Sequence, residues 1–203
     1  MRMENENQYI AQRRIFSLLA ILILSSSLEL EAATDPPHTP KGISPEKVAD
    51  YVHAIIEADR NVYTTHIVKR MQDQGVVRAR EDWEGKNAIP LPAQFLHYAS
   101  KIVAESGSGI RFRLISLWPI YLRNGPATEF ERKALEQLNT NPEVPQRGIV
   151  ATGKKRFFQA VYPDKGISSS CITCHNAHPL SPKRDFKMGD VMGAVVVTIP
   201  LED

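Results

Sequence analysis

The sequence predicts an α+β fold, with an antiparallel sheet and helices packed against it. Three observations lead to this prediction. A long helical pattern comes first and a shorter one follows it, four strand patterns come later, and two of those strands form a hairpin. This order of elements favours an antiparallel sheet covered by helices.

Residues 1–33 have the pattern of a secretory signal peptide. The basic letters AQRR precede an apolar run of about 10–14 residues, and small residues follow at Ala32 and Ala33. A membrane span needs roughly 20 apolar residues, and this run is shorter and interrupted by serines. Leu30 and Glu31 fit the cleavage pattern poorly, so an uncleaved N-terminal anchor is the alternative. We expect an exported, periplasmic protein, or one anchored to the outer face of the inner membrane.

The first helix is predicted to follow a proline-rich linker at residues 34–43. Ser44 is a suitable N-cap, with Pro45 and Glu46 in the first turn. The helix should run to about Gln74 and stop at Gly75. Its periodicity places Arg60, Thr64 and Met71 away from a broad apolar face. That face comprises Val48, Tyr51, Val52, Ile55, Val62, Tyr63 and His66.

The remaining elements follow from local patterns. A second helix should occupy residues 92–105, and the alternating letters IRFRLISLW (110–118) predict a half-buried strand. Thr128 and Glu131 form a capping box that opens a third helix to about Leu138. Strands at 148–152 and 156–162 form a hairpin around Gly153, and the apolar run at 190–200 predicts a final, central strand.

Composition narrows the class of protein. Of 203 residues, 42% are hydrophobic, which is enough for a core, and the formal charge of +2 gives no concentrated basic face for nucleic acid. There are two cysteines, too few for a disulfide scaffold. Because they lie three residues apart, they indicate a site.

The cysteines belong to the letters SSSCITCH, a C-x-x-C-H motif at Cys171, Cys174 and His175. This motif is the attachment signature of a c-type haem. Two thiols add to the two vinyl groups of the haem, and the histidine that follows is the proximal ligand of the iron. We predict one covalently attached haem c, in a loop before the last strand.

Two other chemistries remain as alternatives. With His178, the motif could form a Cys₂His₂ zinc set, although four ligands within eight residues would strain a tetrahedral site. Thiol redox chemistry would need C-x-x-C at the start of a helix. The predicted loop position of the motif argues against thiol redox chemistry.

The second axial ligand is expected to be His66, which falls near the middle of the first helix's apolar face. Methionine and histidine are the usual ligands. Met188 and Met192 flank the last strand and are alternatives, as is an open or water-bound position.

The chain resembles single-haem, c-type domains with a PAS-like fold, which occur as exported proteins and as extracytoplasmic sensor domains. The resemblance covers nearly all of residues 50–200. It implies a PAS-like antiparallel sheet behind a long N-terminal helix, a haem domain over residues 44–203, attachment at Cys171 and Cys174, and His175 as proximal ligand. The matching letters are VYTTHIVKRM, IPLPAQFLHYASKI, FRLISLWPI, FERKALEQL and CITCHNAHPLSPKRDFKMGDVMGAVVVTIP.

The expected function is one-electron transfer by a periplasmic mono-haem cytochrome with a redox partner protein. The alternative is a sensor in which a small diatomic ligand or a redox change acts at the iron. We expect no enzymatic activity and no nucleic-acid partner. A membrane would be involved only through an uncleaved N-terminal segment, and the sequence leaves the oligomeric state open.

Overall fold

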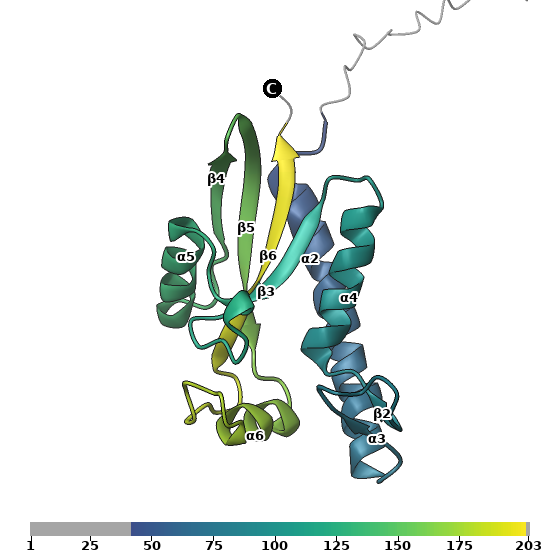
Figure 1. Ribbon diagram of the computed structural model, residues 1–203. Coiled ribbons are helices and arrows are strands. Elements are labelled where there is room, and N and C mark those ends of the chain that lie inside the picture. Colours follow the sequence, from purple (N-terminus) through teal and green to yellow (C-terminus); the bar gives the residue numbers. More distant parts are fainter. Residues whose placement is uncertain (1–41, 202–203) are drawn as a thin grey trace, which may run out of the picture. The chain divides into compact units, whose positions relative to one another are not determined.

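The computed structural model describes residues 42–201 (Figure 1). The predicted signal segment and most of the predicted linker lie outside this range. The helices are α2 (Pro45–Val62), the π-helix η1 (Tyr63–Lys69), α3 (Arg70–Asp73), α4 (Pro92–Glu105), the 3₁₀-helix η2 (Leu122–Asn124), α5 (Glu129–Thr140) and α6 (Ser169–Ala177). The strands are β1 (Arg78–Ala79), β2 (Ala88–Ile89), β3 (Arg111–Ile115), β4 (Gln146–Thr152), β5 (Lys155–Lys165) and β6 (Val191–Leu201).

The main sheet has four strands in the order β3-β6-β5-β4, and all its pairings are antiparallel. The predicted hairpin forms as β4 and β5, and the apolar final strand lies in the centre as β6. The α+β class and the antiparallel sheet are therefore confirmed. β1 and β2 form a separate two-stranded parallel pair.

Helices cover both faces of the sheet (Figure 1). On one face, α2 packs over the alternate residues Phe158, Ala160 and Tyr162 of β5, and α4 packs on β3. On the other face, α5 packs over Val161 and its neighbours on β6. The period-2 alternation of the strands thus divides the core into two layers.

The long first helix exists as predicted, but the predicted apolar face is only partly confirmed, through Val48 and Val52, which pack against the core. α2, η1 and α3 run without a break from Pro45 to Asp73. Among the residues expected to be buried, Tyr51, Ile55, Val62 and His66 are exposed. The core instead receives Ala49, Ile56, Thr64 and Val68.

The π-helix explains part of this error. In an α-helix a step of four residues advances the direction of a side chain by about 40°, so a face spaced every four residues drifts around the axis. The wider i→i+5 turn of η1 counteracts that drift. Residues Arg60, Thr64, Val68 and Gln72 consequently line one cavity, whereas a regular α-helix would spread them over about 120°.

The prediction that the motif lies in a loop is wrong, because the motif lies on the short helix α6 (Figure 1). Ser168 is its N-cap and accepts a hydrogen bond from the Ser170 amide at 3.3 Å. The helix ends at Ala177, and its C-cap His178 precedes Pro179, which disfavours helical geometry in the residue before it. Within residues 42–201, no helix combines the length and apolar character required to cross a membrane.

Candidate functional site

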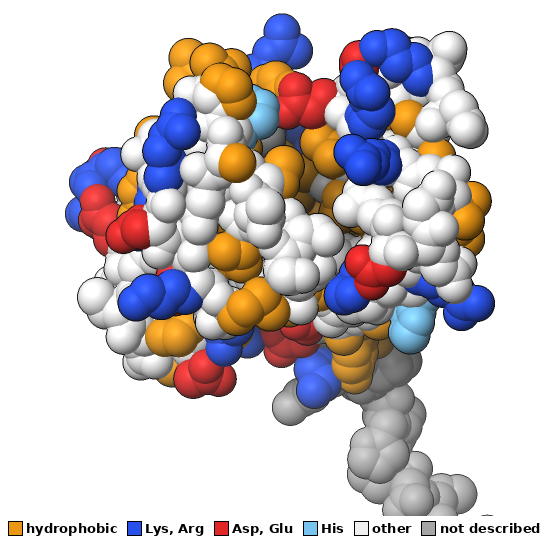
Figure 2. Space-filling view, turned by 90° about the horizontal axis from the view of Figure 1, so that it is seen from below, with side chains coloured by type: hydrophobic (Ala, Val, Ile, Leu, Met, Phe, Trp, Pro, Cys, Tyr) orange, Lys and Arg blue, Asp and Glu red, His pale blue; other side chains and the backbone are white. Residues whose placement is uncertain are grey.

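A cavity opens at the end of the sheet where α6 lies. Seen from that end, the surface is hollowed and hydrophobic side chains line the hollow (Figure 2). The cavity is bounded by α6, by the helical segment α2-η1-α3, by the start of α4 and by the nearby ends of β3, β5 and β6. Its volume is about 220 Å³, and its mouth is open to solvent.

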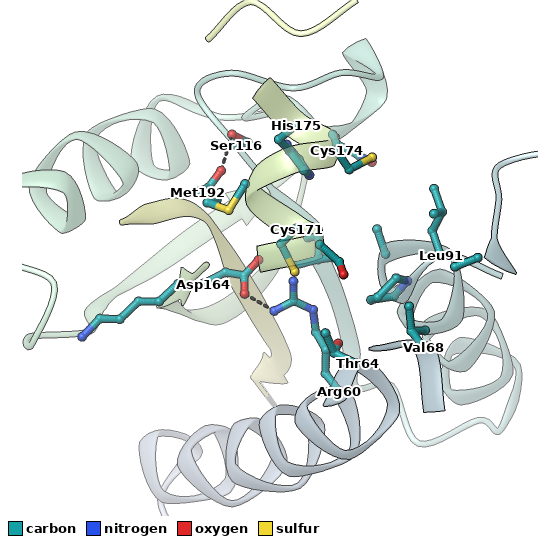
Figure 3. A pocket seen from close by; sticks show the side chains of 18 of the residues that line it. Arg60, Thr64, Val68, Leu91, Ser116, Asp164, Cys171, Cys174, His175 and Met192 are labelled. Atoms are coloured by element: carbon teal, nitrogen blue, oxygen red, sulfur yellow. Dashed lines mark hydrogen bonds and ion pairs between the residues drawn. The ribbon is translucent and has the colours of Figure 1, made fainter. Parts of the chain in front are cut away.

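The three motif residues line the same cavity (Figure 3). Positions i, i+3 and i+4 share one face of a helix, so α6 turns Cys171, Cys174 and His175 in one direction. Both cysteines are free thiols. Burial raises the pKa of both thiols and lowers the pKa of His175. A neutral imidazole is the form that binds metal.

His175 has an unused nitrogen. Its Nδ1 is buried and has no hydrogen-bond partner among the described residues. A buried polar atom without a partner is costly. His175 Nδ1 is therefore a buried polar atom that the described residues leave unsatisfied.

The contacts behind α6 fix its position. Asn176 donates a hydrogen bond from Nδ2 to the Phe186 carbonyl at 2.9 Å, and its Oδ1 accepts one from the Phe186 amide at 3.0 Å. The Phe186 ring is 3% exposed and meets the His175 ring edge to face, with centroids 6.1 Å apart. Asn176 and Phe186 thus orient the histidine from the side away from the cavity.

Close packing also joins α6 to the sheet. A Cβ added to Gly166 would lie 2.6 Å from Ile172 Cδ1 and 2.9 Å from Met192 Sδ. A Cβ on Gly193 would lie 2.4 Å from the Ile115 carbonyl oxygen. At Gly193, near the start of β6, the obstacle is backbone and only glycine fits, whereas at Gly166, just after β5, a larger residue would displace the ends of two side chains.

The opposite wall is the long helix, which contributes Arg60, Thr64 and Val68. Arg60 forms an ion pair with Asp164 at the end of β5, and both side chains are largely buried (Figure 3). Two donors on this wall, Arg60 Nε and Thr64 Oγ1, are buried and have no partner among the described residues. Thr64 is 2% exposed. Both walls of the cavity therefore contain buried polar atoms that no described side chain satisfies.

His66, the predicted second axial ligand, is not brought to the motif. It is exposed and does not line the cavity. The π-helical turn places Thr64 and Val68 on the inner face instead. Of the two methionine alternatives, Met188 is 58% exposed, whereas Met192 lines the cavity.

The geometry does not favour the zinc alternative. His178 uses both ring nitrogens: Nδ1 accepts a hydrogen bond from the Leu180 amide at 3.2 Å, and Nε2 lies 3.0 Å from Glu81 Oε1. Among residues 42–201, no three His, Cys, Asp or Glu side chains gather as a metal site would require.

The loop position no longer argues against the thiol-redox alternative, because C-x-x-C does lie near the start of a helix. A second objection takes its place. Reactive thiols at helix starts have a lowered pKa, whereas burial raises the pKa of both Cys171 and Cys174.

Several site residues were not found by sequence reasoning. Arg60 and Thr64 interrupt an apolar pattern and were assigned to the solvent side. Asp164 and Phe186 lie outside any motif. Gly166 carried a usable signal, since it separates a strand from the motif helix, but its close packing depends on residues distant in sequence.

Comparison with known proteins was made at three levels. The sequence model of the Tll0287-like family matches residues 44–200. No curated protein matches the chain. A similar solved structure is that of the cyanobacterial haem protein Tll0287, with 18% sequence identity and a TM-score of 0.49, covering 79% of this chain and 99% of that one. The resemblance inferred from the sequence is confirmed at the level of the family.

Proposed function

Because the chain belongs to the Tll0287-like family, we propose that it binds one haem in the cavity between α6 and the long helix. Cys171 and Cys174 would form the thioether bonds, and His175 would be the axial ligand from the α6 wall. The family includes a protein described as a haem protein. The PAS-like domain over residues 44–203 belongs to the same proposal.

One observation carries the proposal. A complete C-x-x-C-H motif lies on a single helix face and lines a mostly apolar cavity, and the buried Nδ1 of its histidine has no partner among the described residues. The cavity walls are mostly apolar, as the faces of a porphyrin ring require. The residues present therefore fit the group.

We propose one-electron transfer as the protein's role, with a redox protein as partner and no enzymatic activity. Bound iron would supply the redox change. The chain's own contribution is burial, the orientation of His175 by Phe186, and the charges of Arg60 and Asp164 beside the site. These are the means by which a protein adjusts a haem potential. An exported location, through residues 1–33, is part of this proposal.

A haem-based sensor is the second candidate, and the π-helix favours it. η1 forms the cavity wall opposite the motif, and π-helical turns are frequent at functional sites. A change of ligand at the iron would act directly on this segment. A small diatomic ligand would then replace the redox protein as partner.

The test of the proposal is covalent attachment. We expect the full chain, produced in cells that mature c-type cytochromes, to keep its colour through acid-acetone extraction and denaturing electrophoresis. The double variant Cys171→Ser/Cys174→Ser should lose all covalent haem. Ser170→Ala, which changes a neighbouring residue of the same cavity, should retain it. Colourless wild-type protein would contradict the proposal.

A further inference from the structure

The long-helix wall offers hydrogen-bond donors where a second iron ligand was expected. Its residues toward the cavity are Arg60, Thr64, Val68 and Gln72. None of these four carries an imidazole or a sulfur atom. If the haem is held from α6 as proposed above, the wall facing its other side has no strong protein ligand within the described chain.

Met192 is the one remaining candidate among the cavity residues, and it lies on the wrong side. Its Sδ and Ile172 Cδ1 both approach Gly166, within 3 Å of the same point. Ile172 belongs to α6, one turn before His175. Met192 therefore packs against the helix that carries the proximal histidine and is not across the cavity from it.

The two donors on the long helix are unpartnered although they are buried. Thr64 Oγ1 and Arg60 Nε make no hydrogen bond within the described residues, while Arg60 Nη1 pairs with Asp164. A buried hydroxyl and a buried guanidinium N–H each need an acceptor. Thr64 is one turn along from Arg60, so both can approach one small molecule.

A haem propionate is a poor candidate for this acceptor. The propionates lie on the edge of the ring opposite the vinyl groups that form the thioethers. Arg60 lies beside Cys171 (Figure 3), and its charge lowers the pKa of that thiol against the larger effect of burial. Arg60 is thus at the thioether edge, away from the propionates.

We propose that the cavity binds a small anionic or diatomic ligand at the haem iron, and that Thr64 Oγ1 and Arg60 Nε donate hydrogen bonds to its outer atoms. This inference rests on the proposed haem function. The iron would have an exchangeable position facing η1, and the donors would select ligands whose outer atom carries negative charge.

Azide titration of the oxidised full-length protein tests this inference, with visible absorption as the readout. Wild-type protein should show saturable spectral changes. Thr64→Val keeps the shape of the side chain and removes the donor, so azide affinity should fall about tenfold. The matched control is Thr65→Val, because the Thr65 hydroxyl bonds to the Asn61 carbonyl at 2.7 Å and lies outside the cavity lining. The azide affinity of Thr65→Val should stay within about twofold of wild type.

Arg60→Lys provides a second variant that keeps the charge toward Asp164 but removes Nε. Azide affinity should again fall, with covalent haem content unchanged. Haem-bearing protein that shows no azide response, or equal affinities for wild type, Thr64→Val and Arg60→Lys, would overturn the inference alone. Protein without covalent haem would overturn the proposed function as well.

Discussion

The two walls of the cavity differ in how they are built. On the α6 wall, Cys171, Cys174 and His175 come from one turn of one short helix, and their spacing is a known motif. On the long-helix wall, Arg60, Thr64 and Val68 are spread over about two turns that straddle a change from α to π geometry. In our proposals the first wall attaches the cofactor, and the second donates hydrogen bonds to a small ligand.

The α6 wall is specified by local sequence, whereas the long-helix wall is specified by tertiary structure. A motif of five residues specifies its own geometry once a helix forms. The donors on the long helix become a set only because the π-helical turn keeps every fourth residue on the inner face. They also depend on Asp164, which is more than 100 residues from Arg60 in the chain.

The largest loss of stability is expected on the α6 side, at Phe186. Phe186→Ala should lower the free energy of unfolding by about 3 kcal/mol, because it empties a buried site behind His175. Chemical denaturation followed by circular dichroism measures this. Met188→Ala, at a side chain that is 58% exposed, should cost less than about 0.5 kcal/mol. Equal effects would mean that Phe186 does not support the α6 wall.

A smaller effect is expected on the long-helix side. Asp164→Asn should lower the free energy of unfolding by about 2 kcal/mol, since it leaves the largely buried Arg60 charge unpaired. The matched control is Asp73→Asn, whose ion pair with Lys69 is exposed on the same helical segment and should cost about 0.5 kcal/mol or less. If the two variants are equally stable in denaturant titrations, the Arg60–Asp164 pair is not a structural part of the wall.

The sequence predicted most of the fold because the strands and helices follow simple periods. The second helix was placed at its observed bounds, residues 92–105, and the hairpin and central strand were identified. The motif was found because three chemical groups are adjacent in sequence. The helical state of the motif was missed because its letters have no amphipathic pattern and its N-cap, Ser168, lies within a run of three serines.

The inner face of the long helix could not be predicted for a physical reason. Apolar periodicity locates a face that packs on other side chains, but half of this helix lines a cavity and presents Arg60 and Thr64 to it. The same analysis placed His66 inside, whereas it is exposed. Nothing in the sequence marked the π-helical turn.

The smallest effect is expected at the other end of the long helix, where the helix is anchored to the sheet. The Asp50 carboxylate accepts hydrogen bonds from Tyr162 Oη at 2.7 Å and from Arg147 Nη2 at 2.8 Å. The hydrogen bond from Tyr162, followed by that from Arg147, lowers the pKa of Asp50 below its usual 3.8 against the opposing effect of burial.

A carboxylate whose pKa is lowered by folding stabilises the folded state above its unfolded pKa, and that stability is lost as the pH falls through the folded pKa. Asp50→Asn should therefore show a shallower loss of stability between about pH 5 and about pH 3 than wild type. The difference should be about 0.5 kcal/mol, because Asp50 is 39% exposed and solvent screens its interactions. Denaturant titrations across this range measure it, and parallel pH curves would contradict it.

The central claim is that iron is held from the α6 wall alone. Visible absorption spectra of His175→Ala and His66→Ala, recorded side by side on haem-loaded protein, test it most directly. We predict a shifted Soret band for His175→Ala, with a spectrum identical to wild type for His66→Ala. A low-spin wild-type spectrum that becomes high-spin in His66→Ala would contradict the claim.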